Sequence, residues 1–224
     1  RAGVIVLGPL LSRFGKAKVS LPGGCAIGTR PVDIHLFGLK KLGAQIKIKN
    51  GYILAEAKKG LKGTKITFPS ISVGATENVI IAASYAKGTT YLKNCACEPE
   101  IKNLTDFLKK MGIKIYWTNK RSIKIIGNQK LKSAIHSVMF DRIEAGTFII
   151  AGALAAKKLR ILGLESKILK KELIVLKKMG VKIKTKKNEI SVFHSKNIRS
   201  ASINTEPYPG FPTDLQAQIM VLMT

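Results

Sequence analysis

The sequence has few of the residues that build disulfide frameworks, metal centres or membrane spans. It contains three cysteines and three histidines in 224 residues. The cysteine count is odd and Cys95 and Cys97 are nearly adjacent, so no disulfide framework is expected. The scattered histidines and this cysteine spacing do not fit a zinc site. No apolar run approaches the roughly 20 residues of a membrane span, and no signal-peptide pattern is present. We therefore expect a cytoplasmic protein without a metal, a cofactor or a membrane partner.

Acidic residues are also scarce. Lys and Arg total 39 against 13 Asp and Glu, which gives a formal net charge of +26. Such an excess favours nucleic-acid binding, but aromatic residues make up only 6% of the chain, so stacking platforms are few. Lysines alternate with isoleucines at 46–49 and 181–184, which is typical of the solvent face of strands. We interpret most of the charge as compositional bias. A basic nucleic-acid-binding module remains the non-enzyme alternative, and it requires lysines gathered on one face.

An internal repeat is the strongest architectural signal. A Leu-Lys-Lys-Leu/Met-Gly motif followed by an alternating strand pattern occurs three times, and its Leu42, Met111 and Met179 are 69 and 68 residues apart. Each copy predicts an amphipathic helix that ends at a left-handed glycine and leads directly into a strand. The predicted order within a unit is strand, helix, strand, helix, strand, strand.

The rest of the chain can be divided around these copies. Further helices are predicted at 76–86, 101–111, 145–156 and 166–179, and strands at 17–21, 89–94, 122–126 and 159–162. The opening stretch 2–11 reads as a strand-like run followed by a short helix or turn. A boundary near 133–140 predicts two domains, at 1–139 and 140–224. The chain lacks an initiator methionine and ends within a helical pattern, so we interpret it as an internal fragment.

A glycine-rich loop at 21–33 carries one cysteine and one arginine. Three glycines let the backbone bend closely around a ligand, and prolines stiffen both ends. Cys25, with Arg30 close in sequence, is a candidate acid or nucleophile with a lowered pKa. A surface turn with an incidental small hydrophobic residue remains the alternative.

Two other segments are candidate sites. Thr213 and Gln216 form a capping-box pattern, which places Asp214 in a first helical turn as a possible proton acceptor or as a helix-stabilising residue. The turn at 71–76 joins a strand to a helix, a geometry that can receive phosphate. The acidic residues at 98–100 and 141–144 are more typical of helix starts and salt bridges.

Taken together, these segments resemble the enolpyruvyl transferases. The matching stretches are 1–2, 7–10, 20–28, 30–33, 72–76, 98–101, 141–144 and 211–218. The resemblance implies an α/β fold: an inside-out α/β barrel built from repeated βαβαββ units, with two domains, the second one truncated here. It also implies an enzyme that transfers enolpyruvyl from phosphoenolpyruvate to the 3-hydroxyl of UDP-N-acetylglucosamine, the first committed step of peptidoglycan synthesis.

The resemblance assigns roles residue by residue. Cys25 matches the acid that protonates C3 of phosphoenolpyruvate, bonds to it covalently and reacts with fosfomycin. Asp214 matches the base that takes the hydroxyl proton, and Arg30 matches a cation that meets the phosphate. The residues implied in binding UDP-N-acetylglucosamine are Arg1, Arg30, Pro31, Val32, Asp33, Ile34, Ser70, Ile71, Ser72, Val73 and Asp214.

Two departures from the family pattern bear on activity. Ser70 stands where a lysine is common, which affects contact with the diphosphate. The N-terminal lysine–asparagine pair and the later arginines of the family lie outside this chain, so we expect these 224 residues alone to be inactive. The sister enzyme acting on shikimate 3-phosphate is the alternative within the family; it is not expected to carry the Pro-Gly-Gly-Cys loop.

Overall fold

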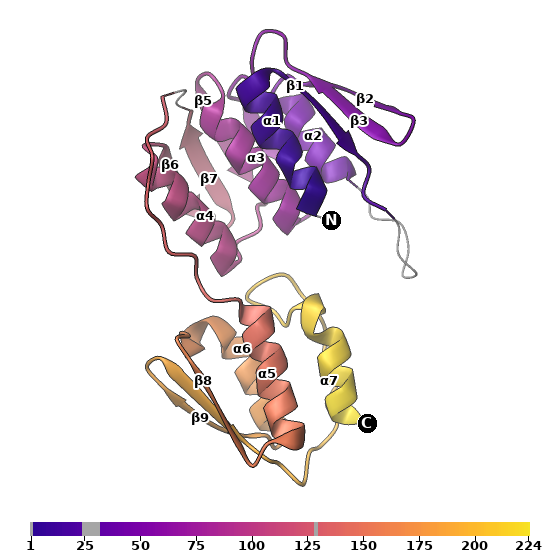
Figure 1. Cartoon of the computed structure of the whole chain (residues 1–224), viewed down its shortest axis with the longest axis vertical. Coiled ribbons are helices and arrows are strands. Elements are labelled where there is room, and N and C mark those ends of the chain that lie inside the picture. Colours follow the sequence, from indigo (N-terminus) through magenta and orange to yellow (C-terminus); the bar gives the residue numbers. More distant parts are fainter. Residues whose placement is uncertain (1, 24–31, 128–129) are drawn as a thin grey trace. The chain divides into compact units, whose positions relative to one another are not determined.

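A computed structural model describes residues 2–23, 32–127 and 130–224 (Figure 1). The chain divides into two compact units, Arg1–Ser137 and Val138–Thr224. Both mix helices with strands, so the predicted α/β class is confirmed. The division falls inside the stretch 133–140 where the sequence predicts a boundary. The assignment of 1–139 and 140–224 to two enolpyruvyl transferase domains stays a prediction.

Among its described residues, the first unit contains two sheets with helices packed against them. Its helices are η1 (Ala2–Val6, a 3-10 helix), α1 (Leu7–Phe14), α2 (Asp33–Lys41), α3 (Val73–Tyr85) and α4 (Pro99–Lys110). Its strands are β1 (Lys16–Ser20), β2 (Gln45–Lys49), β3 (Tyr52–Glu56), β4 (Lys65–Thr67), β5 (Thr89–Lys93), β6 (Lys114–Asn119) and β7 (Ser122–Ile126). The strand orders are β1-β3-β2 and β4-β5-β7-β6.

Helix α3 lies at the centre of this unit. It contacts α1, α2 and α4 as well as strand β7 (Figure 1). Ala75, Val79 and Ala83 on this helix are fully buried. A helix that is apolar over most of its circumference is typically enclosed by neighbours, and the small residues let those neighbours approach closely. The core of the unit is therefore built around α3.

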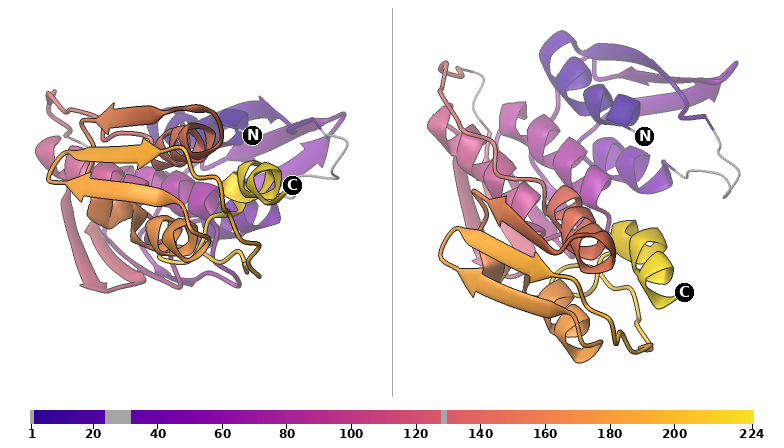
Figure 2. Two further views of the ribbon diagram at one scale, coloured as in Figure 1. Left: turned by 90° about the horizontal axis from the view of Figure 1, so that it is seen from below. Right: turned by 60° about the horizontal axis from the view of Figure 1, so that its bottom comes forward.

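The second unit has one sheet and three α-helices among its described residues. Its elements are α5 (Arg142–Ala155), β8 (Lys158–Leu162), η2 (Ser166–Leu169), α6 (Lys170–Lys178), β9 (Lys182–Lys186), β10 (Glu189–Phe193), η3 (Thr213–Leu215) and α7 (Gln216–Met223). The strand order is β8-β10-β9. Helix α5 packs between this sheet and α7 (Figure 2).

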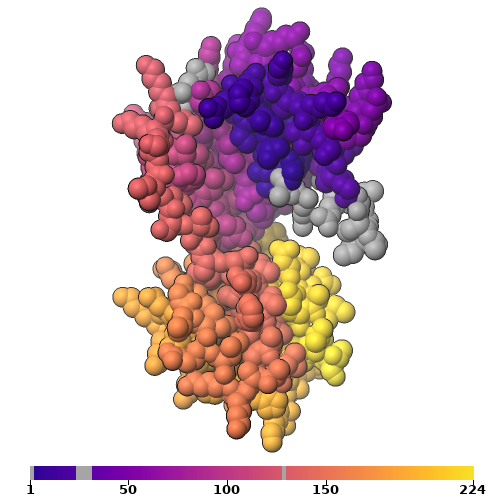
Figure 3. Space-filling model, viewed as in Figure 1, coloured from indigo at the N-terminus to yellow at the C-terminus, as the bar shows by residue number. Residues whose placement is uncertain are grey.

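Helices α5 and α7 of this unit keep apolar side chains at the surface. Phe148 of α5 is 52% exposed, and Met220 and Val221 of α7 are exposed as well. Figure 3 shows α7, in yellow, at the surface of the unit. Ile149 and Ile150, which follow Phe148 on α5, are by contrast buried.

The three copies of the repeat have the same local structure. Gly43, Gly112 and Gly180 follow α2, α4 and α6 with φ of +100°, +98° and +97°. In each copy the glycine N–H and the next N–H bond back to carbonyls of the last helical turn, at 2.9–3.1 Å. This is the Schellman arrangement, which the left-handed glycine makes possible. The predicted helix–glycine–strand unit is confirmed.

Strand pairing repeats as well. The orders β1-β3-β2, β5-β7-β6 and β8-β10-β9 each place the last strand of the copy in the middle, with antiparallel neighbours. The middle copy also has a preceding strand, β4, which pairs in parallel with β5. Residues 65–126 therefore form a complete βαβαββ unit, in the order that the sequence predicts.

The opening stretch corrects one prediction. Residues 2–11 are not a strand; they form η1 and most of α1. Val4, Leu7 and Leu11 are all buried, and their spacing of three and four residues is that of a helix face. Pro9 lies in the first turn of α1, where a missing N–H leaves no helical bond unmade. Gly8-Pro9 therefore does not break the helix.

No helix in the described ranges could span a membrane.

Candidate functional site

The residues singled out from the sequence divide into three groups. Arg1, Cys25, Arg30 and Pro31 lie outside the described residues. A second group lies at the starts of α2 and α3 in the first unit, and Asp214 lies in η3 of the second unit.

The start of α2 carries three of the predicted residues. Val32 precedes the helix, is buried in the core, and its carbonyl accepts the Leu36 N–H at 3.0 Å. Asp33 is the first residue of the helix and is exposed, and Ile34 is half-buried. A carboxylate in this position is favoured by the helix dipole. Val32 therefore anchors the turn from which Asp33 and Ile34 reach the surface.

The start of α3 carries the other predicted segment, Ser70 to Val73. Ser70 is exposed, and the next three residues are half-buried. Ser72 caps the helix: its Oγ accepts the Ala75 N–H at 3.3 Å, and its carbonyl accepts the Thr76 hydroxyl at 2.7 Å. Helix starts of this kind direct N–H groups outward and suit anions. A strand, β4, leads into this helix as predicted, but the helix begins at Val73, so residues 73–76 form its first turn and not the connecting turn.

Two buried polar residues connect these helix starts, and sequence reasoning missed both. Asn78 is fully buried on α3, and its Nδ2 lies 3.2 Å from Nδ1 of His35 on α2. The detectable signal was a polar residue directly before the apolar run 79–83. A single polar residue, however, does not indicate its partners.

Asp214 lies in a 3-10 turn rather than at a capped α-helix start. Thr213 makes no side-chain cap; instead the Gln216 backbone N–H bonds to the Thr213 carbonyl. The predicted capping box is therefore wrong, because residues 213–215 form the separate turn η3 and α7 begins only at Gln216. The Asp214 side chain is exposed.

The turn that carries Asp214 is anchored on both sides. Phe211 and Leu215 are each 1% exposed. Leu215 packs over Gly146 of α5, where an added Cβ would lie 2.6 Å from its Cδ1. Gln218 Nε2 donates to Thr147 Oγ1 at 3.0 Å. Asp214 is thus presented from a backbone that α5 holds in place.

The acidic residues of the 141–144 segment are structural, as the sequence predicts. Asp141 caps α5, and its Oδ1 accepts the N–H groups of Ile143 at 2.7 Å and Glu144 at 3.1 Å. Arg142 forms a buried ion pair with Glu172 of α6, with 3.7 Å between Nη1 and Oε1. This pair joins the two helices of the repeat.

Cys95 and Cys97 are buried free cysteines. Burial raises the pKa of the Cys95 thiol to about 12 and also raises that of Cys97. Both remain protonated at neutral pH, which suits a structural role. Burial, with Glu100 and Glu98 nearby, raises the pKa of Glu77. In the part of the chain that is described, no group of three or more His, Cys, Asp and Glu side chains could hold a metal ion.

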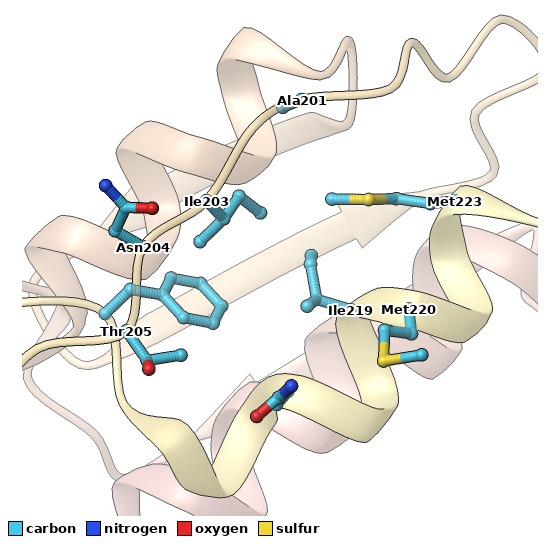
Figure 4. A pocket seen from close by; sticks show the side chains of 9 residues that line it. Ala201, Ile203, Asn204, Thr205, Ile219, Met220 and Met223 are labelled. Atoms are coloured by element: carbon cyan, nitrogen blue, oxygen red, sulfur yellow. The ribbon is translucent and has the colours of Figure 1, made fainter.

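The second unit contains a cavity of ≈510 Å³ between the segment 201–205 and α7 (Figure 4). Its lining residues are Ala201, Ile203, Asn204, Thr205, Phe211, Gln216, Ile219, Met220 and Met223. Two methionines and several aliphatic groups form part of its wall, and the polar side chains of Asn204, Thr205 and Gln216 form the rest. Asp214 does not line it, although Gln216 does.

Comparison with known proteins identifies the class. The chain belongs to the EPSP synthase (3-phosphoshikimate 1-carboxyvinyltransferase) family, whose model matches residues 1–224. An enolpyruvyl transferase, NikO from Streptomyces tendae, has a TM-score of 0.83 at 22% identity over 97% of this chain and 52% of its own. EPSP synthase from Acinetobacter baumannii has a TM-score of 0.62 at 19% identity, over 90% of this chain and 48% of its own. These likenesses confirm the enolpyruvyl transferase-like fold.

The curated relatives share a name that is more specific than that of the family. UDP-N-acetylglucosamine 1-carboxyvinyltransferase of Pelagibacter ubique is 62% identical over 223 residues, covering 100% of this chain and 54% of the relative. The protein of the same name from Trichlorobacter lovleyi is 49% identical over 223 residues, which cover 100% of this chain and 53% of that relative. The chain thus spans about half the length of the curated relatives it matches.

Proposed function

We propose that this chain is about half of an enzyme that transfers enolpyruvyl from phosphoenolpyruvate to the 3-hydroxyl of UDP-N-acetylglucosamine and releases phosphate. The 62% identity along the entire chain to a relative of that name carries the proposal. The reaction is the first committed step of peptidoglycan synthesis. We propose that it takes place in the cytoplasm.

The proposed chemistry needs one acid and one base. Cys25 donates a proton to C3 of phosphoenolpyruvate and can bond to it covalently, while Asp214 takes the proton of the sugar hydroxyl. Arg30 is the cation that meets the phosphate, because a guanidinium stabilises phosphate charge. Separate groups for opposite proton transfers let each keep the protonation state its step requires. The exposed Asp214 side chain on its anchored turn supports the assignment of the base.

UDP-N-acetylglucosamine is proposed to bind along the starts of α2 and α3. The proposed contacts are Arg1, Arg30, Pro31, Val32, Asp33, Ile34, Ser70, Ile71, Ser72, Val73 and Asp214. The capped start of α3 supports this arrangement, because outward N–H groups and the helix dipole attract a diphosphate. Ser70 is exposed but uncharged, so the helix start carries more of this contact than in relatives with a lysine.

Two alternatives are less well supported. The sister reaction on shikimate 3-phosphate shares the fold, but the relatives at 62% and 49% identity carry the other name. A nucleic-acid-binding module needs concentrated charge. The lysines instead lie on strands of all three sheets, in both units.

The test uses the complete protein with both substrates and measures phosphate release. Asp214→Asn should lower kcat by about 10²–10⁴-fold, the usual contribution of a general base. Asp33→Asn is the matched charge control, because it should alter KM for UDP-N-acetylglucosamine more than kcat. The isolated 224 residues should release no phosphate. Equal turnover by Asp214→Asn and the unmodified protein would refute the assignment of the base.

Fosfomycin tests the acid independently. It should alkylate Cys25 in the complete protein, and intact-mass and peptide analysis should locate a single adduct. Cys95 and Cys97 serve as internal controls, because both are buried and protonated. An adduct on either control cysteine, or none at all, contradicts the role of Cys25.

A further inference from the structure

The side-chain amide of Asn78 joins three segments of the first unit. Its Oδ1 accepts the Gly8 N–H of α1 at 2.7 Å. Its Nδ2 donates to the Val4 carbonyl of η1 at 3.0 Å and lies 3.2 Å from Nδ1 of His35 on α2. Asn78 is 0% exposed. An asparagine amide has two donor hydrogens and one acceptor oxygen, and all of them have partners here.

This network fixes the tautomer of the neutral His35 ring. The Gly8 N–H can only donate, so the amide oxygen of Asn78 must face it and the nitrogen must face Val4 and His35. Nδ1 of His35 therefore accepts, and in the neutral ring the proton is on Nε2. The tautomer is assigned by the hydrogen-bond partners of Asn78.

The other edge of the imidazole faces the first turn of α3. An added Cβ on Gly74 would lie 3.1 Å from Cε1 and 3.3 Å from Nε2 of His35. Gly74 directly follows the segment Ser70–Val73, and His35 directly follows Asp33 and Ile34. The ring thus lies between the two segments that we propose to bind the nucleotide sugar.

We propose that His35 is a positioning residue for the UDP-N-acetylglucosamine site. Anchored by Asn78, its imidazole sets the spacing between the start of α2 and the first turn of α3. A fully satisfied buried network defines one arrangement of the elements it joins, which apolar packing alone specifies less well. The inference rests on the proposed function, because it concerns the same binding segments.

Two substitutions of His35 test the contacts of the two edges of its ring separately. His35→Asn keeps a polar group near the Nδ1 position, so Asn78 retains a partner, but it does not reach Gly74. His35→Gln places its amide near the Nε2 position. His194→Asn is the matched control, because it makes the same chemical change at an exposed histidine that belongs to none of the proposed binding segments.

The measurement is steady-state kinetics of the complete protein. His35→Asn should raise KM for UDP-N-acetylglucosamine about tenfold, because the shorter side chain no longer fills the space against the first turn of α3. Both kcat and KM for phosphoenolpyruvate should change less than about twofold, and His35→Gln should recover part of the loss. Gly74→Ala should also raise KM for UDP-N-acetylglucosamine, because its Cβ presses on the ring.

The outcomes are distinguishable. An unmodified protein that does not turn over these substrates refutes the proposed function and, with it, this inference. If it does turn over and His35→Asn leaves KM for UDP-N-acetylglucosamine unchanged, only the inference fails. Equal effects on kcat and on both KM values show a merely structural role and also overturn it. If His35→Asn does not fold, Gly74→Ala decides: a selective rise in KM supports the inference, and an unchanged KM refutes it.

Discussion

Gly8→Ala should destabilise the first unit strongly, although alanine favours helices. The added Cβ would lie 2.6 Å from the Asn78 carbonyl oxygen, and nearer still to its Oδ1. Helices α1 and α3 must then move apart, which typically costs about 1–3 kcal/mol. The bond from the Gly8 N–H to Asn78 would be lost as well, and an unsatisfied buried group costs about 1–3 kcal/mol.

The higher helix propensity of alanine offsets only about 1 kcal/mol of this destabilisation. We therefore expect a net loss of about 3 kcal/mol in the free energy of unfolding of the first unit. With a slope of about 2 kcal/mol per molar urea, the unfolding midpoint should fall by about 1.5 M.

The single tryptophan makes this measurement selective. Trp117 lies on β6, and its Nε1 donates to Thr105 Oγ1 at 3.2 Å, so its fluorescence in urea reports on the first unit alone. Gly3→Ala is the matched control, because no heavy atom lies within 4 Å of its added Cβ. Its free energy of unfolding should change by no more than about 0.5 kcal/mol, the range of a neutral surface substitution. Equal stability of Gly8→Ala and Gly3→Ala would show that the close approach of α1 and α3 is not as described.

Two further predictions concern titration and reactivity. The Arg160 guanidinium, together with the Ser191 hydroxyl, lowers the pKa of Glu189 to about 2. The ionised carboxylate therefore stabilises the fold fully above its unfolded pKa near 4.3, and this contribution is lost as the pH falls through about 2. Carboxyl-carbon NMR titration should show this low pKa and its return toward 4.3 in Arg160→Gln; a pKa near 4 in the unmodified chain would contradict the ion pair. Cys95 and Cys97 should resist iodoacetamide at pH 7.5 in the native chain and react after unfolding in urea, because burial raises the pKa of both thiols; rapid native labelling of either would contradict their burial.

Local signals in the sequence predicted much of the fold. The helix ends at Gly43, Gly112 and Gly180 were predictable because a left-handed glycine and its two backbone bonds involve only neighbouring residues. The Ser72 cap is also local, yet the helix was predicted to begin at 76 and not at Val73. The alternation of apolar and basic residues likewise located the strands of each copy, since the period of two follows from strand geometry.

Features that depend on distant residues were not predictable. The network of Asn78 joins residues 43 and 70 positions away, and nothing in the local pattern around Asn78 indicates those partners. The expected cap at Thr213 failed because Phe211 and Leu215 are drawn into the core and fold the turn differently. In the candidate site, Val32 to Ile34 and Ser70 to Val73 were found through the resemblance, whereas His35 emerged only from its contacts.

The lysine-rich strands lie where the sheets end. In the sheets of the described residues, the end strands β2, β6 and β9 carry exposed lysines, among them Lys47, Lys114 and Lys184. A strand at the end of a sheet offers backbone groups to any strand of another molecule, and closely spaced positive charges make that approach unfavourable. Part of the +26 charge therefore protects the end strands of these three sheets against aggregation. High salt, which screens this repulsion, should be the condition under which the protein first begins to associate.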